Sequence, residues 1–202
     1  MTRDAAIAAA TAYFDDGRFQ SDLAALVAYP TESQNPEAAP ELRRYLDEAM
    51  LPRLTALGFA CEIFDNPVPG GAPLLVGERI EDAGLPTILT YGHGDTVRGQ
   101  EGMWRDGLHP FTLTEDGERL YGRGAADNKC QHLINIAALE QVLSVRGRLG
   151  FNVRIVLEMA EETGSTGLGA FFRQNRDRLA ADVLIASDGP RLQPDTPPMF
   201  MG

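Results

Sequence analysis

The chain has 202 residues, of which 44% are hydrophobic and 23% are charged, and its formal net charge at pH 7 is −11. This size and composition are typical of one globular domain, or of one domain with part of a second. The negative charge argues against nucleic acids and anionic membranes as partners, because contacts to phosphate require clustered Lys and Arg side chains. Carboxylates gathered around bound cations would account for part of the acidic excess.

The cysteines and the first residues bear on the compartment. Cys61 and Cys130 are isolated and form no CxxC pair, so reduced thiols in a cytoplasmic protein are the simplest interpretation. The alanine-rich start is not typical of a signal peptide, because Asp4 interrupts it and its apolar residues are Ala rather than Leu. No apolar run approaches the length that spans a membrane. We therefore expect a cytoplasmic protein.

The first part of the chain is predicted to be helical. Residues 4–29 indicate two short helices with a break near Gly17. Their apolar stripe is expected to comprise Ile7, Phe14, Leu23, Leu26 and Val27. A polar turn over 31–36 follows, and its Ser33 lies where a loop could face a substrate, although a simple turn is the better interpretation. Residues 37–57 have apolar side chains at helical spacing, which predicts one long helix.

Strands are predicted to begin after this helix. Short apolar runs bounded by turn residues indicate strands at 59–64, 74–80 and 87–92. Their strand-turn-strand order suggests an antiparallel edge before the sheet becomes parallel. A long loop over 98–118 is predicted to contain a short hairpin near 111–113 and 120–121.

Strands and helices alternate from residue 87 onward. Helices are predicted at 129–146 and 168–175, and strands at 151–157 and 182–186. Such alternation is typical of parallel strands joined by crossover helices. The fold class is therefore predicted to be α/β, with a mostly parallel mixed sheet and helices on both faces.

A glycine-rich stop at the end of the strand 87–92 contains His93 and Asp95. Open α/β sheets keep their ligands beyond the carboxyl ends of strands, which makes these two side chains candidates for a site. A turn whose Asp caps the next segment explains this stretch equally well when it is taken alone. The other two histidines have no obvious partner ligand: His109 is predicted to be a surface or packing residue, and His132 a packing residue.

Further acids follow the other predicted strands. Glu161 and Glu162 come after the strand 151–157, Asp188 follows 182–186, and Asp127 lies in a Gly-rich turn before a helix. Parallel strands would bring these groups to one edge of the sheet, where they would repel one another unless cations neutralise them. Imidazole nitrogen with carboxylate oxygens suits Zn²⁺, and a shared carboxylate suits two ions. Each acid taken alone is more simply explained as a helix cap or a solvated residue. The prediction of a metal site therefore depends on the placement of all these acids together at the strand ends.

Four segments in this order resemble the motifs of the M20 metallopeptidase family, which includes dipeptidases, aminoacylases, carboxypeptidases and deacetylases. They are His93–Val97 (HGDTV), Gly122–Lys129 (GRGAADNK), Glu161–Ser165 (EETGS) and Ser187–Pro190 (SDGP). The resemblance implies a zinc-dependent hydrolase of amide bonds in dipeptides or N-acyl amino acids.

The resemblance also implies a set of metal ligands. His93 and Asp188 would bind one zinc ion, Glu162 would bind a second, and Asp127 would bridge the two. Co²⁺ or Mn²⁺ would be possible replacements for zinc in a complete site.

Two further roles follow from the resemblance. Asp95 would hold the far ring nitrogen of the histidine ligand and so fix its tautomer. Glu161 would act as the general base, taking a proton from the attacking water and passing it to the leaving amine. The resemblance also implies a cis peptide bond between Asp127 and Asn128. Cys130 replaces the glycine that is usual after the motif lysine, which we interpret as a change in packing rather than as a reactive thiol.

The resemblance extends over nearly the whole chain, but family members are about twice as long. We therefore expect residues 1–202 to be the amino-terminal portion of an M20-type catalytic domain, an incomplete zinc-exopeptidase-like fold. A lid and dimerisation domain and a carboxy-terminal catalytic segment with the last His ligand would be absent. The full-length protein would be a homodimer, and this portion alone would be inactive.

Two other interpretations remain open at this point. The chain could be a natural short metal-binding or interaction protein without catalysis. It could also be a flavodoxin-like binding domain whose acids are only caps. The acid at position 127 disfavours the latter, because it occupies the approach to a helix where free amides would bind phosphate.

Overall fold

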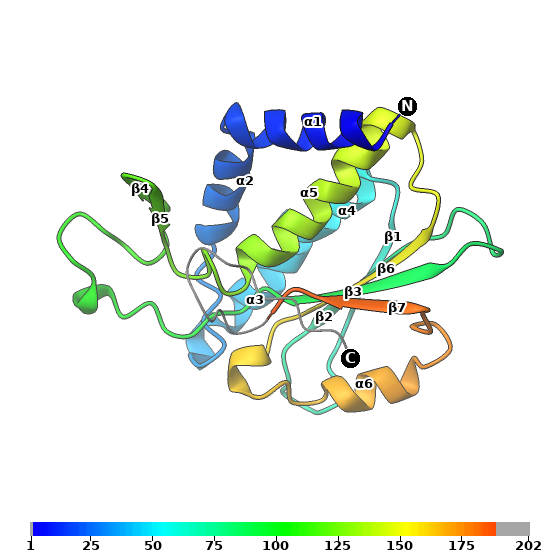
Figure 1. The fold of residues 1–202 in the computed structure, drawn as a ribbon. Coiled ribbons are helices and arrows are strands. Elements are labelled where there is room, and N and C mark those ends of the chain that lie inside the picture. The colour runs from blue at the N-terminus through cyan, green and yellow to red at the C-terminus, as the bar shows by residue number, and fades with distance from the viewer. Residues whose placement is uncertain (1, 189–202) are drawn as a thin grey trace.

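A computed structural model of the protein describes residues 2–188. Its main feature is a five-stranded mixed sheet, shown in Figure 1. The strands lie in the spatial order β1 (Ala60–Phe64), β2 (Leu74–Arg79), β6 (Asn152–Glu158), β3 (Thr87–His93) and β7 (Val183–Ala186). A separate hairpin consists of β4 (Thr114–Asp116) and β5 (Arg119–Tyr121).

The directions of the strands confirm the predicted antiparallel edge. β1 pairs with β2 and β2 pairs with β6 in antiparallel fashion, whereas β3 runs parallel to both β6 and β7. In this register His93 lies opposite Glu158, and Tyr91 lies opposite Ala186. The carboxyl ends of β6, β3 and β7 therefore meet at one edge of the sheet, where the predicted site residues follow them.

Helices cover both faces of the sheet, as predicted. The longer ones are α1 (Arg3–Asp15), α2 (Arg18–Val27), α5 (Lys129–Arg146) and α6 (Leu168–Gln174). Between α2 and β1 the chain forms η1 (Pro36–Ala38), α3 (Ala39–Arg44), η2 (Tyr45–Met50) and α4 (Leu51–Ala56). Figure 1 shows α6 alone on one face of the sheet and α1, α2, α4 and α5 on the other.

The segment 37–57, predicted as one long helix, is helical throughout most of its length but changes type along the chain: η1 is a 3-10 helix, α3 and α4 are α-helices, and η2 lies between them. The middle segment, η2, is a π-helix that directly precedes α4. Pro52, in the first turn of α4, has no N–H to donate to the carbonyl four residues earlier, so a regular hydrogen-bond ladder cannot continue through this point.

Two hydrophobic cores lie on opposite faces of the sheet. Successive side chains of β6 point to opposite faces, so that Ile155 belongs to the core under α4 and α5 and Val156 belongs to the core under α6. The first core is the larger and includes Leu54 and Leu133, both fully buried, whereas the second is built around Phe171. The chain therefore buries enough apolar surface on each face to hold the strand ends in place.

The apolar stripe predicted for the first two helices is wrong for α1. Ile7 and Phe14 are 50% and 65% exposed, whereas Tyr13 is buried. The Tyr13 hydroxyl donates a hydrogen bond of 2.5 Å to Asp22, and Arg53 binds the same carboxylate at 2.8 Å. Because most of the remaining side chains of α1 are small, this one ring and its polar contacts decide which side of the helix faces the domain.

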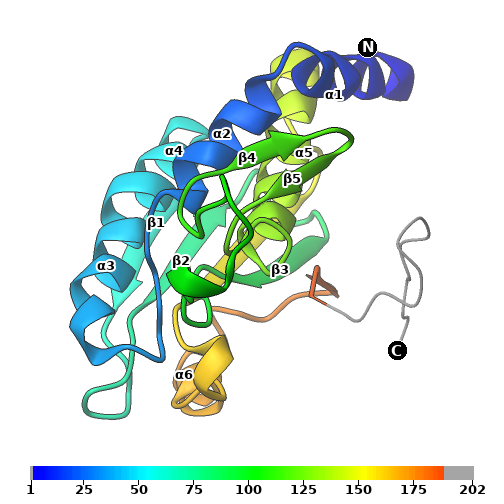
Figure 2. The same ribbon diagram turned by 90° about the vertical axis from the view of Figure 1, so that its left-hand side faces the viewer.

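The hairpin after the long loop begins later than predicted, at Thr114 rather than near residue 111. Gly117 has a φ of 63° between its two strands, and this turn sets the register. Figure 2 shows the hairpin beside α2, where Gln20 donates a hydrogen bond of 3.0 Å to Glu115. Over residues 2–188, no helix is both long enough and apolar enough to cross a membrane.

The edge strand β7 leads to a first testable prediction. Val183, Leu184 and Ile185 are 50%, 63% and 44% exposed, and β7 pairs with β3 on one side. An apolar edge strand with free backbone groups is a template for pairing with another chain. We therefore expect concentration-dependent self-association in sedimentation velocity, weakened by Leu184→Lys. Ile7→Lys, which changes an apolar residue on α1 that is also at least half exposed, should leave it unchanged, and a wild-type protein that stays monomeric would contradict the prediction.

Candidate metal centre

His93 is the last residue of β3, and its side chain is completely buried. Gly94 follows it because the chain must turn away from the sheet in close contact with other groups. A Cβ atom on Gly94 would lie 2.5 Å from the Tyr45 ring and 2.8 Å from the sulfur of Met159. Packing thus requires a glycine after the histidine. The turn at this glycine brings Asp95 into contact with the imidazole ring.

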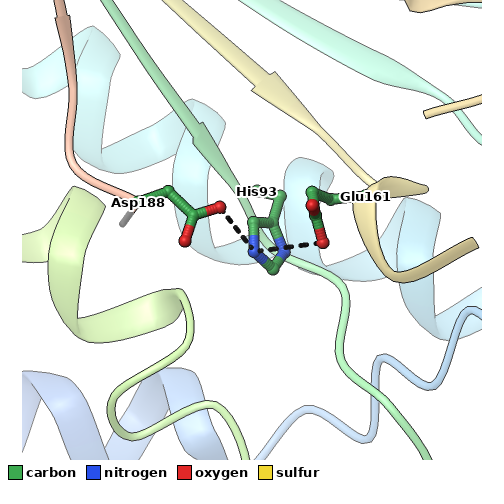
Figure 3. A group of neighbouring side chains, drawn as sticks. All are labelled: His93, Glu161 and Asp188. Carbon is green, nitrogen blue, oxygen red and sulfur yellow. Dashed lines mark ion pairs between the residues drawn. The ribbon is translucent and has the colours of Figure 1, made fainter. Parts of the chain in front are cut away.

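Three carboxylates converge on the Nε2 atom of His93. The nearest oxygen of Asp127 lies 3.1 Å away, that of Asp188 lies 3.5 Å away, and that of Glu161 lies 3.9 Å away. Figure 3 shows Asp188 and Glu161 on either side of the ring, one reached from β7 and the other from the segment after β6. The ligand atoms of His93, Glu161 and Asp188 all lie within 4.8 Å of one another. Within residues 2–188, they form the one group of three side chains that could hold a metal ion.

The other ring nitrogen of His93 faces Asp95. Nδ1 lies 3.1 Å from the backbone oxygen of Asp95 and 3.2 Å from its carboxylate. A proton on Nδ1 is therefore held by Asp95, so Nε2 is the ring nitrogen that faces the three carboxylates and would be available to a metal ion. The imidazole has the orientation that a metal ligand requires.

The carboxylate of Asp95 also fixes the backbone of the glutamate pair, which was not foreseen from the sequence. One of its oxygens accepts the N–H of Glu161 at 3.1 Å, and the other accepts the N–H of Glu162 at 3.2 Å. A single buried side chain thus holds the histidine ring and both glutamates in one arrangement.

Asp127 lies at the start of α5, and the peptide bond between Asp127 and Asn128 is cis, as the resemblance implies. Its side chain is 65% exposed, although one of its carboxylate oxygens contacts the Nε2 atom of His93. Asp188 is the carboxylate that raises the pKa of Glu161 most, whereas Asp127 is the one that raises the pKa of Glu162 most.

The electrostatics of the site follow from crowding of like charges. Burial raises the pKa of Glu161, Glu162 and Asp188, and their carboxylate neighbours raise it further against the opposing effect of His93. Burial acts to lower the pKa of His93, but hydrogen bonds to Asp127 and Asp95 outweigh it and raise the pKa to about 10. A divalent cation would relieve this repulsion, and one imidazole nitrogen with carboxylate oxygens is a donor set that suits zinc.

Several residues that support the site were not identified from the sequence. Glu158, at the end of β6, accepts hydrogen bonds from the hydroxyls of Tyr91 at 2.6 Å and Ser165 at 2.8 Å, and so holds the turn that follows the glutamate pair. Thr31 donates a hydrogen bond of 2.6 Å to the backbone oxygen of Gly94. The signal that could have revealed Glu158 is an acid at the end of an apolar strand, next to the acids already singled out.

The two remaining histidines are not members of the metal group. His109 forms an isolated bridge with Thr112 in the long loop. His132 is buried in α5, and its Nε2 atom lies 2.6 Å from the hydroxyl of Tyr45, as expected for a packing histidine.

His132 leads to a prediction about pH. Burial, with the charges of His93 and Lys129, lowers the pKa of His132 to about 3. An unfolded chain would protonate this residue below about pH 6.5, whereas the folded protein does not, so its contribution to stability is lost as the pH falls from about 6.5 to about 3. We expect the free energy of unfolding to fall by up to about 1.4 kcal/mol per pH unit in this range. Urea denaturation of wild type and His132→Gln should show a smaller slope in the variant, and equal slopes would contradict the prediction.

Comparison with known proteins identifies the family. A model of the family described as peptidase family M20/M25/M40 matches residues 89–198, a range that contains all six candidate site residues. The chain belongs to the M20 peptidase family. The M20 resemblance drawn from four short motifs is thereby confirmed over more than half of the chain.

Individual relatives agree with this M20 assignment. The chain is 32% identical over 186 residues to the β-Ala-His dipeptidase of Mus musculus, covering 85% of this chain and 37% of the mouse protein. It is 32% identical over 176 residues to the acetylornithine deacetylase of Pasteurella multocida, covering 87% and 44%. The crystal structure of human carnosine dipeptidase 1 superposes with a TM-score of 0.81 at 29% identity, covering 90% of this chain and 41% of that one. The predicted fold class is thus confirmed, and the chain spans less than half the length of these M20 relatives.

Proposed function

We propose that residues 1–202 are the amino-terminal portion of the catalytic domain of a zinc-dependent hydrolase that cleaves amide bonds in dipeptides or N-acyl amino acids. The observation that carries this proposal is the convergence of Asp127, Asp188 and Glu161 on the Nε2 atom of His93 in a chain of the M20 family.

The metal ligands in this proposal are the four that the motifs suggest. His93 and Asp188 would hold one zinc ion, Glu162 would hold a second, and Asp127 would contribute to both. Support comes from the distances of Asp127 and Asp188 to His93, and from Asp127 being the carboxylate that raises the pKa of Glu162 most. When bound, zinc supplies a Lewis acid that polarises the amide carbonyl and makes a water molecule more acidic. Co²⁺ and Mn²⁺ are alternative ions for the same donors.

Glu161 is the proposed general base. Burial and the charge of Asp188 raise its pKa, which brings the carboxylate closer to the range where it can accept and return a proton near neutral pH. Its side chain is 38% exposed, so it can reach a water molecule at the mouth of the site. Its backbone is held by Asp95, so the base keeps its position while it takes a proton from the attacking water and passes it to the leaving amine.

The substrate class in this proposal rests on the relatives. One of them is a dipeptidase for β-Ala-His and another is a deacetylase of acetylornithine, so small peptides and N-acyl amino acids are the substrates to test. A cytoplasmic location and a homodimer in the full-length protein are further parts of the proposal. So is the low activity of residues 1–202 alone, since the lid and the last His ligand implied by the resemblance would lie outside them.

Metal analysis tests the metal centre directly. Because residues 2–188 contain one group of three ligand atoms in mutual range, we expect one tightly held zinc ion per chain after dialysis. His93→Ala should remove it, whereas His109→Ala should keep it. Two tightly held ions, or none, would contradict this prediction.

An activity assay tests the reaction. Zinc-loaded residues 1–202 should hydrolyse β-alanyl-histidine or N-acetylornithine about 10²–10³-fold or more below ordinary enzyme rates, because an oxyanion donor would come from the lid. Turnover at ordinary rates that disappears in Glu161→Ala would support the hydrolase and show that the site is complete without the lid. Tight zinc binding with no turnover in any chain that contains this segment would favour a metal-binding protein without catalysis.

A further inference from the structure

Asp188 occupies a position that packing alone does not fix. It lies two residues beyond β7, whose side chains at 183–185 are largely exposed. Its carboxylate nevertheless stands 3.5 Å from the Nε2 atom of His93, on a different strand. The backbone ladder between β3 and β7 ends at the pair of Tyr91 and Ala186, so contacts beyond this ladder must set the position of Asp188 relative to His93.

Two asparagines of the α5 segment make that contact through Ser187. The side-chain amide of Asn128 donates to the backbone oxygen of Ser187 at 2.9 Å. The amide of Asn135 donates to the hydroxyl of Ser187 at 2.9 Å, and that hydroxyl lies 3.3 Å from the side-chain oxygen of Asn135. Residues seven apart lie on the same face of a helix, two turns from each other, so both amides can reach one residue.

The same two side chains also reach β3. The side-chain oxygen of Asn128 lies 3.4 Å from the backbone nitrogen of His93, and the amide of Asn135 lies 3.4 Å from the hydroxyl of Thr90. A Cβ atom on Gly92 would lie 3.1 Å from the oxygen of Asn128, so the glycine leaves room for this approach. Each asparagine thus joins β3 to the residue just before Asp188.

The use of Asn128 is unusual for its place in the helix. It is the N-cap residue of α5, a position where an asparagine side chain commonly accepts a hydrogen bond from its own helix, yet it makes no such bond. It is completely buried, and its amide is directed to β3 and β7 instead. The Asn128 side chain therefore does not cap α5 but contacts the ends of both β3 and β7, which indicates a role in setting the distance between these two strand ends.

We propose that Asn128 and Asn135, acting through Ser187, are positioning residues that set the distance between Asp188 and His93 and thereby the metal affinity of the site. This inference rests on the proposed function, because it assumes that these two side chains hold a metal ion. Asn135 lies outside all four sequence motifs, so only its contacts reveal the role.

Cobalt titration tests the proposal, with the visible absorption of bound Co²⁺ as the readout. Ser187→Ala removes the hydroxyl that Asn135 holds, and we expect about a 10–100-fold loss of Co²⁺ affinity together with a changed absorption spectrum. Ser187→Thr restores a hydroxyl and should recover most of both. Asn175→Ala, which removes an amide that donates to a backbone oxygen in α6 on the other face of the sheet, should change neither. Unchanged affinity and spectrum in Ser187→Ala would overturn the proposal.

Hydrogen exchange without metal separates this inference from the proposed function. Loss of one such hydrogen bond should speed exchange of the β7 amides in Ser187→Ala by about three- to tenfold, whereas Asn175→Ala should leave them unchanged. Equal exchange in wild type and Ser187→Ala would overturn the inference even if the protein binds cobalt. A wild type that binds no cobalt would overturn the proposed metal site and, with it, the role given to these asparagines.

Discussion

Glu161→Gln is expected to reduce the hydrolytic rate of the zinc-loaded protein by about 10²–10⁴-fold while leaving its zinc content unchanged. Glutamine keeps the size of the side chain but cannot accept and return a proton. The backbone hydrogen bond to Asp95 is not altered, so the segment should keep its position. Zinc content by metal analysis and hydrolysis of β-alanyl-histidine, measured on the same preparation, check both parts.

Glu162→Gln is the matched variant, and the opposite result is expected. Its neighbour Glu161 shares the same anchor on Asp95, so the two substitutions disturb the backbone alike. If Glu162 is a zinc ligand, its replacement should weaken zinc binding first and reduce the rate only as a consequence.

The pair of variants also decides between two assignments of the glutamates. The structure brings an oxygen of Glu161, rather than of Glu162, within 4.8 Å of the ligand atoms of His93 and Asp188. If Glu161 were the ligand, Glu161→Gln would release zinc and Glu162→Gln would retain it. That outcome would refute the roles proposed above and exchange them.

Asp95→Ala is expected to destabilise the protein by about 3–5 kcal/mol, the range typical of a buried ion pair that loses one partner. The carboxylate is fully buried and accepts hydrogen bonds from the His93 ring and from the backbone of both glutamates. Its removal would take one carboxylate from the charged imidazole and leave the N–H groups of Glu161 and Glu162 without this acceptor. For a chain of this size the midpoint of thermal unfolding should fall by roughly 6–20 °C.

Thermal unfolding of Asp95→Ala should be compared with that of Asp16→Ala. Asp16 pairs with Arg18 at 2.8 Å on the surface, and its side chain is 48% exposed. Removal of such a pair costs about 0–1 kcal/mol. Asp95→Asn, which keeps the shape and loses the charge, should fall between the two. If Asp95→Ala were no less stable than Asp16→Ala, the network around this carboxylate would not hold the site together.

The sequence by itself was enough to predict the order of the elements and the chemistry at the strand ends. Helix α5 was predicted with its observed bounds because apolar residues recur at helical spacing and a glycine follows Arg146. The apolar runs that form β3, β6 and β7 lead to His93, Glu161 and Asp188, at or within three residues of the strand ends, so parallel strands alone were enough to bring these groups together. The pattern of α5 is a local feature of the sequence. The meeting of the strand ends follows from one rule, that the carboxyl ends of parallel strands lie at the same edge of a sheet.

Contacts between distant segments were decided only by the tertiary structure. No local pattern distinguishes Tyr13 from Phe14 as the buried ring of α1, because the choice depends on Asp22 and Arg53 in other helices. The same holds for the anchoring of both glutamates on Asp95 and for the two asparagines that hold Ser187. These hydrogen bonds join residues that are far apart in the chain, and short polar side chains of these types serve equally well as caps or turn residues until the fold places a partner beside them.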